Sequence, residues 1–182
     1  MSEDKKPKRK VAFDIDYDDE KLYGFFTSDL KKIDQDVDVS LRKFFKEEKV
    51  DKKGNVIIVN KKISNVDIYS LAALVGKFIY ENEKDLEIKQ ELKEQMELNK
   101  HKTYVRFEQR ESDEKTILKA IAVSETGDIN LLKDENREEL AKYAEGYARI
   151  GIKKLYTWAT NPGFDFETEL SDVLLSFYEK YQ

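Results

Sequence analysis

The sequence predicts an α+β fold, in which a small antiparallel or mixed sheet packs against several helices and a long helical region lies toward the C-terminus. Near the N-terminus and again after residue 100, apolar residues alternate with polar ones, as in half-buried strands. Elsewhere apolar residues recur every three or four positions, as in amphipathic helices. The 182 residues include 40% hydrophobic and 12% aromatic side chains, which is enough to bury one core.

The N-terminal region divides into a tail and the start of the folded part. Residues 1–9 are polar and carry a run of lysines, so we expect a disordered basic tail followed by a single α+β domain over residues 10–182. Val11–Ile15 alternates apolar and acidic residues and predicts a strand. A short helix capped by Asp18 or Asp19 is expected next, and a second helix is expected to begin near Asp36–Ser40.

The central region predicts one short strand and two helices. Lys52–Asn55 contains Gly54 and predicts a turn, and the apolar run Val56–Val59 predicts a buried strand. Ser64 or Asn65 can cap a helix with a broad apolar face. The following helix, Asp85–Lys100, is highly charged and its apolar stripe is thin, so we expect it to be exposed at the edge of the domain.

The C-terminal half predicts a hairpin and two long helices. Thr103–Gln109 and Thr116–Ser124 are predicted to be strands, and the polar loop between them, Glu111–Lys115, indicates an antiparallel hairpin. A long helix is predicted over Asp134–Thr160, and Asn161–Gly163 is a break. Glu167–Tyr181 has a regular apolar stripe and predicts the last helix, with Asp165 or Thr168 as its cap.

The composition excludes most common catalytic and metal-binding chemistry. The chain has no Cys and one His, His101, which rules out thiol nucleophiles, zinc–thiolate sites and two-histidine metal sites. No phosphate-binding glycine loop is present. We therefore expect no catalytic residue set, no cofactor and no bound metal. No apolar stretch is long enough to cross a membrane and no secretory signal is recognisable, so the cytoplasm is the expected compartment.

The clearest candidate binding surface is the predicted strand after residue 100. Lys102, Tyr104, Arg106 and Arg110 alternate onto one face, where a tyrosine between cations could stack a base and neutralise phosphates. An ordinary charged sheet face would have the same pattern, and Glu108 interrupts it. The other cations that we expect to contact a nucleic acid or a protein partner lie in the tail and on the long C-terminal helix: Lys8, Arg9, Lys10, Arg149 and Lys153.

A second candidate site is acidic. Asp14 and Asp16 lie at alternate positions of the first predicted strand, as in many Mg²⁺-dependent nucleases, and Glu108 could supply a third ligand. The same residues are better explained as an acidic strand edge before a helix N-terminus, where the helix dipole favours negative charge. The sequence therefore favours this structural interpretation over a metal site.

The sequence therefore favours a non-enzymatic interaction protein. The net charge of −5 argues against general nucleic-acid binding, and 27 of the 33 cationic residues are Lys, as in an AT-rich genome. We expect a phage or mobile-element accessory protein that binds and inhibits a host protein or nucleoprotein, such as a defence nuclease of a CRISPR or restriction system. The alternatives are a nucleic-acid-binding module that uses the tail and the Tyr104 face, and a metal-dependent nuclease that uses Asp14 and Asp16.

Overall fold

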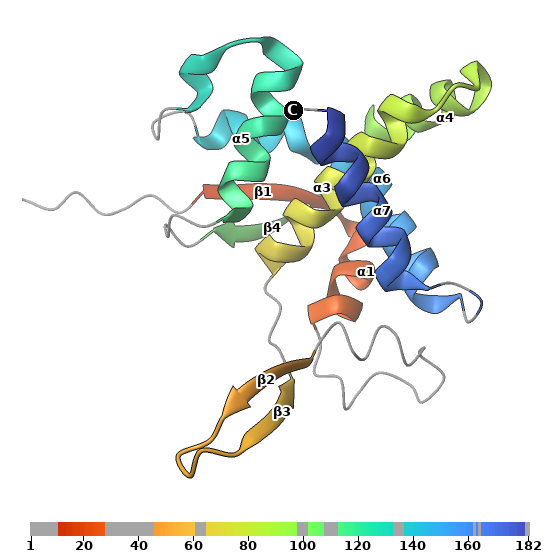
Figure 1. The fold of residues 1–182 in the computed structure, drawn as a ribbon. Helices are drawn as coiled ribbons and strands as arrows, with labels where there is room; N and C mark the ends of the chain where they lie inside the picture. The colour runs from red at the N-terminus through yellow and green to blue at the C-terminus, as the bar shows by residue number, and fades with distance from the viewer. Residues whose placement is uncertain are drawn as a thin grey trace, which may run out of the picture.

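Most of the described chain is helical in the computed structural model (Figure 1). The structure describes residues 11–27, 46–60, 65–97, 102–107, 113–132, 137–161, 163 and 165–180. In this part there are two sheets, each with only two antiparallel strands. The predicted α+β class is therefore wrong, and the fold is nearer to all-α. The basic tail and the helix expected near Asp36–Ser40 lie outside the described residues.

Two long helices form the centre of the fold. Helix α3 (Asn65–Asn82) packs along α6 (Arg137–Thr160), and these two helices make the most extensive contact between elements. Both were predicted from the sequence. Around them lie α1 (Tyr17–Thr27), α5 (Asp113–Thr126) and α7 (Phe166–Lys180). The largest side chains buried almost completely are those of Tyr69, Lys77, Phe166, Ile68, Ile121, Ile152 and Leu155.

Glycine allows α3 and α6 to approach closely. A Cβ atom on Gly76 would lie 1.9 Å from the carbonyl oxygen of Tyr147, and one on Gly151 would lie 1.7 Å from that of Ala72. Neither distance leaves room for a methyl group, and the obstructing atoms belong to backbone rather than to movable side chains. The closest point of the crossing therefore requires glycine on both helices.

The predicted strand near the N-terminus is confirmed, but the predicted pairing is wrong. Strand β1 (Val11–Asp16) pairs antiparallel with β4 (Lys102–Phe107), and Phe13 lies opposite Val105. The segment expected to pair with β4 is instead helix α5. Its buried residues Leu118, Ile121 and Ala122 follow the three- and four-residue spacing of a helix. The β-branched residues of this segment suggested a strand, but helical burial overrides that preference.

Strands β2 (Lys46–Val50) and β3 (Val56–Asn60) form a separate hairpin that stands away from the helices (Figure 1). Strand β2 was not predicted. The turn and the strand at Val56–Val59 were predicted, but the strand was expected to be buried. Val56 is 63% exposed and Ile57 41% exposed, so the prediction of a buried strand is wrong where the side chains are described.

The remaining elements lie at the ends of the core helices. Helix α4 (Leu86–Glu97) has no buried residue, as its thin apolar stripe predicted. A short 3-10 helix, η2 (Ile129–Leu132), follows α5 and buries Leu131. Asp165 caps α7, because its carboxylate accepts hydrogen bonds from the Thr168 hydroxyl at 2.9 Å and from the Thr168 amide at 3.4 Å. Across the described ranges, no helix combines the length and apolar character needed to cross a membrane.

Candidate partner-binding surface

The two candidate sites predicted on strands lie on neighbouring positions of one sheet. Asp14 is opposite Tyr104, and Asp16 is opposite Lys102. Residues directly opposite each other in an antiparallel pair share a face, so the acidic pair and the basic strand belong to the same face. Two acidic positions opposite this strand reduce the net positive charge of the paired segments, on which phosphate binding would depend. The pairing therefore weakens the electrostatic argument for a nucleic-acid site on β4, where Arg106 is opposite Ala12.

Several predicted site residues fall outside the part of the chain that the structure describes. These are Lys8, Arg9, Lys10, Glu108 and Arg110. Their roles stay predictions, as does metal binding by Asp14 and Asp16. Among the residues that are described, no group of three or more His, Asp or Glu side chains is placed to hold a metal ion.

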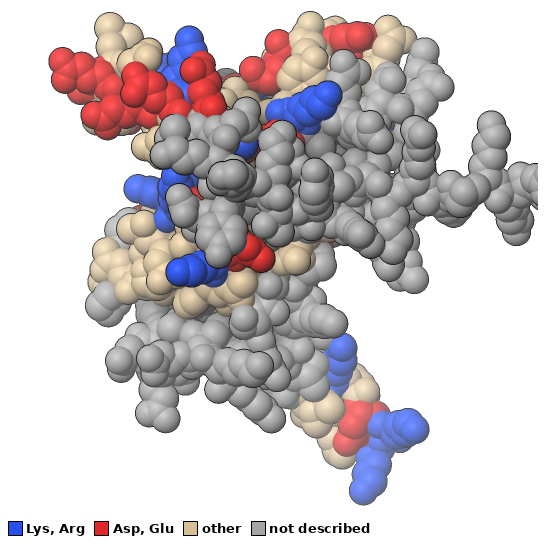
Figure 2. Space-filling view, turned by 180° about the vertical axis from the view of Figure 1, so that it is seen from behind, with Lys and Arg blue, Asp and Glu red and all other residues tan. Residues whose placement is uncertain are grey.

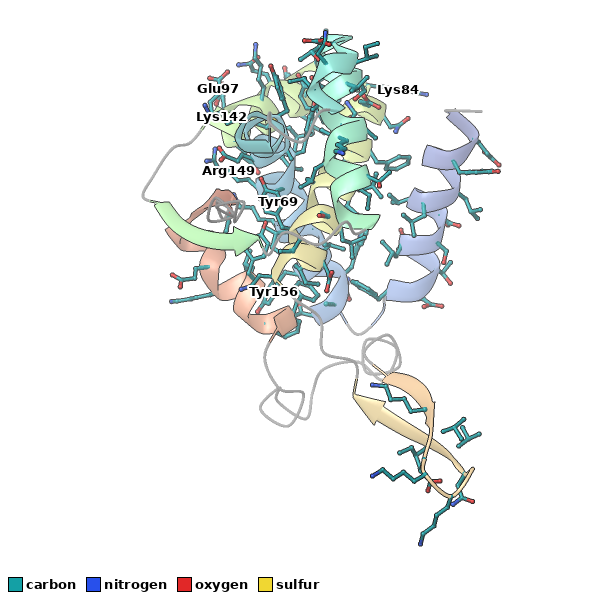
Figure 3. The ribbon with its side chains drawn as sticks, turned by 90° about the vertical axis from the view of Figure 1, so that its left-hand side faces the viewer. Tyr69, Lys84, Glu97, Lys142, Arg149 and Tyr156 are labelled. Atoms are coloured by element: carbon teal, nitrogen blue, oxygen red, sulfur yellow. The ribbon has the colours of Figure 1, made fainter. Side chains whose placement is uncertain are left out.

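Arg149 lies inside the fold and contacts the end of α4. Its Nη1 atom donates a hydrogen bond to the carbonyl oxygen of Met96 at 2.6 Å, and the residue is buried. Figure 3 shows Arg149 on the same side of the molecule as Lys142 of α6 and Glu97, the last residue of α4. A cation at this end also interacts favourably with the helix dipole. Arg149 thus holds α4 to α6, whereas Lys153, the other predicted residue on α6, is exposed.

Replacing Arg149 with Met is expected to loosen α4. The change removes a charged hydrogen bond to a helix carbonyl, so we expect the free energy of unfolding to fall by about 1.5–3 kcal/mol. Amide hydrogen exchange should accelerate in α4 more than in α3. Lys153→Met removes an exposed cation four residues away and should change stability by less than about 0.5 kcal/mol. Equal exchange rates in α4 of the wild type and the Arg149 variant would contradict this role.

Helix α7 has two apolar faces rather than the single stripe expected from the sequence. The inner face, which includes Phe166, Leu170 and Val173, is buried in the core. The outer face consists of three apolar residues, Leu174, Leu175 and Tyr178, and the polar Ser171 one turn before them, and we call these four residues the α7 outer stripe. All four are exposed; Leu175 is 59% exposed and Tyr178 65% exposed. Exposed apolar residues at this spacing are typical of a helix that binds in a groove of another protein.

Acidic residues flank the α7 outer stripe and cover α4. Asp172 and Glu179 are exposed on α7 itself. Helix α4 adds a second acidic surface, which Figure 2 shows at its free end. The exposed acids of that helix are Glu87, Glu91, Glu94 and Glu97, which outnumber its two lysines, Lys89 and Lys93. These charges disfavour acidic partners and favour a surface that carries Lys or Arg.

A buried lysine joins α3, α5 and α6. The Lys77 side chain is 1% exposed, and its ammonium contacts the carboxylate of Glu125 and lies 2.7 Å from Glu81. It also lies 5.0 Å from the centre of the Tyr147 ring, whose hydroxyl donates to Glu125 at 2.9 Å. Sequence reasoning missed this cluster, although Lys77 is the only charged residue between Asp67 and Glu81 and interrupts an otherwise apolar helix face.

The charges in this cluster compensate one another. Burial alone would lower the pKa of Lys77, but hydrogen bonds and charge from Glu125 and Glu81 outweigh it and raise the pKa above 10.5. Burial raises the pKa of Tyr147 strongly, and its hydrogen bond to Glu125 adds to the effect. Both groups are therefore kept protonated at neutral pH. The cluster neutralises buried charge between three helices and is a structural feature of the core.

Comparison with known proteins finds no protein family that matches the chain, and no curated protein or solved structure matches it either.

Proposed function

We propose that this protein is a non-enzymatic interaction protein that docks the α7 outer stripe into an apolar groove of another protein. The α7 outer stripe is the single observation that carries the proposal. Soluble monomers rarely leave contiguous large apolar side chains exposed on a regular helix. Leu174, Leu175 and Tyr178 do so on a helix whose other face is already buried, so the exposure is not needed to form the core.

The charge around the stripe supports a partner with a basic rim. Asp172 and Glu179 lie beside the stripe on α7, and α4 adds further acidic groups. The like charges around the stripe disfavour its pairing with the α7 of a second copy. Proteins that bind nucleic acid commonly line their grooves with Lys and Arg. These features fit a nucleic-acid-processing enzyme as the partner, and we propose that the chain is an accessory protein of a phage or mobile element that binds and inhibits such a host defence nuclease in the cytoplasm.

Binding is expected to depend on Leu175 and Tyr178. We expect Leu175→Glu/Tyr178→Glu to weaken partner binding by about 1000-fold or more, because hot-spot aromatic and aliphatic anchors contribute about 2 kcal/mol or more each and burying the new carboxylates opposes docking. The tagged chain is incubated with lysate of a low-GC bacterium, with and without nuclease treatment, and captured proteins are identified by mass spectrometry. Ile129→Glu, an exposed apolar residue on η2 changed in the same way, is the control.

Three outcomes separate the alternatives. The proposal is supported if the wild type and Ile129→Glu capture a basic nuclease and the double variant does not. The added chain should also inhibit cleavage by that nuclease. Equal capture by all three proteins rejects the α7 outer stripe as the interface. Capture that disappears with nuclease treatment would instead favour nucleic-acid binding through Tyr104 and the basic tail.

A further inference from the structure

The β2–β3 hairpin has apolar side chains that the helical body does not cover. Val50 is 70% exposed, and Val56 and Ile57 are also exposed. The hairpin stands apart from the helices in two perpendicular views (Figures 1 and 3). A two-stranded hairpin by itself is at best marginally stable in water, whereas three or more strands with an apolar face are stable. A hairpin that stands apart from the helices therefore points to an additional strand that pairs with one of its edges.

The turn of the hairpin is well defined and fixes the register. One carboxylate oxygen of Asp51 accepts hydrogen bonds from the amides of Lys53 at 2.7 Å and Asn55 at 2.9 Å. Gly54 has a φ of +84°, which favours glycine. The backbone hydrogen bonds from Asn55 and Lys53 also lower the pKa of Asp51, the Asn55 amide being the largest cause. Because the turn holds the strands in register, the hairpin presents a defined edge.

The two edges of the hairpin differ in charge. Strand β2 has the sequence Lys-Glu-Glu-Lys-Val, whereas β3 has the sequence Val-Ile-Ile-Val-Asn and carries no charge. Sheet edges in monomeric proteins are usually protected by charged residues or proline, and β3 has neither. Within the described residues, β3 pairs with β2 alone. The neutral, β-branched edge of β3 is therefore the edge suited to pairing with another strand.

We propose that the outer edge of β3 pairs antiparallel with β3 of a second copy, so that two hairpins form one four-stranded sheet. A two-fold axis at Ile58 places Ile58 opposite its own counterpart and Ile57 opposite Val59 of the second copy. All five residues of β3 then have a partner, and none of the five is charged. A neutral strand that meets itself in this way satisfies the symmetry of a two-fold dimer. This association is independent of α7.

The substitution Ile58→Lys tests the pairing of β3 between two copies without destabilising the hairpin of either copy. Within one chain, residue 58 is opposite Glu48, so the new lysine gains a complementary neighbour there. Across the two-fold axis it meets the lysine of the second copy. We expect the wild type to sediment as a dimer, and Ile58→Lys to raise the dissociation constant of the dimer by about tenfold or more. Val50→Lys, on β2 beside the turn, is the control and should remain dimeric.

Restoring opposite charge should restore the dimer. The variant Glu48→Lys/Ile58→Glu keeps a complementary pair within its hairpin and should be monomeric alone, because two glutamates meet at the axis. Mixed with Ile58→Lys, it should form a heterodimer that native mass spectrometry resolves. A wild type that stays monomeric at every concentration overturns the proposal, as does loss of the dimer in Val50→Lys. A mixture that remains monomeric while the wild type is dimeric rejects this pairing.

Discussion

Replacing Gly76 or Gly151 with Ala is expected to lower the free energy of unfolding by about 3 kcal/mol or more, at the upper end of the range for overpacking. The added methyl group would lie less than 2 Å from a backbone carbonyl oxygen of the facing helix at either position. No side-chain rotation can relieve such a contact, so α3 and α6 must move apart. That movement would also disturb the contacts of Lys77 on α3 and Tyr147 on α6.

Gly24→Ala is the matched control for this prediction. Gly24 lies within helix α1, and a Cβ atom there would have no heavy atom within 4 Å. Alanine is more favourable than glycine in a helix by about 0.5–1 kcal/mol, so this variant should be slightly more stable than the wild type. Urea denaturation followed by circular dichroism measures all three variants. Unfolding free energies of the Gly76 and Gly151 variants within about 1 kcal/mol of the wild type would contradict the close crossing.

The elements that the sequence predicted well are those with a strong local signal. The apolar spacing of α3 and the break at Asn161–Gly163 before α7 were sufficient to place both helices. Strand β1 was placed by simple alternation. In each case the pattern reflects which face contacts the core, and that information is local in the chain.

The errors arose where short segments carried competing signals. Thr116–Ser124 combines β-branched residues with helical spacing, and burial against α3 and α6 decides for the helix. The pairing of β1 with β4 joins segments about 90 residues apart, and no local pattern encodes such a contact. Strand β2 is mostly charged and resembles a loop in the sequence. Its register comes from the turn at Asp51 and from the apolar residues of β3.

The candidate site was only partly predictable for a related reason. The sequence singled out cations, but the structure places Arg149 inside the fold and brings the acidic residues Asp14 and Asp16 opposite β4. The α7 outer stripe was missed because Leu174 was assigned to the same apolar stripe as Leu170 and Val173. Only the packing of Phe166 and Leu170 shows which face is inward.

Replacing Lys77 with Met is expected to lower the free energy of unfolding by about 2–3 kcal/mol at neutral pH. Methionine keeps most of the apolar volume of the side chain, so the loss of stability reflects the removal of the ammonium group and of its two ion pairs. Glu81 and Glu125 are partly exposed, and water can hydrate them once the lysine is gone. Their partial hydration keeps the expected loss below that of a fully buried, uncompensated carboxylate. Lys89→Met is the control, because Lys89 contacts the Tyr80 ring at 5.1 Å near the surface and should cost about 0.5 kcal/mol.

The pH dependence provides an independent test of the Lys77 cluster. The folded state raises the pKa of Lys77 above its ordinary value of 10.5. The contribution of Lys77 to the free energy of unfolding is therefore complete below pH 10.5 and is lost as the pH rises through the pKa of Lys77 in the folded state. The stability difference between the wild type and Lys77→Met should therefore be constant from about pH 7 to pH 9 and should shrink above about pH 10.5. Tyr147, whose pKa is also raised, makes both proteins less stable above about pH 10, but this loss is largely common to the two. Urea denaturation across this range measures the difference, and a gap that widens with alkaline pH would show that the lysine is destabilising in its charged form.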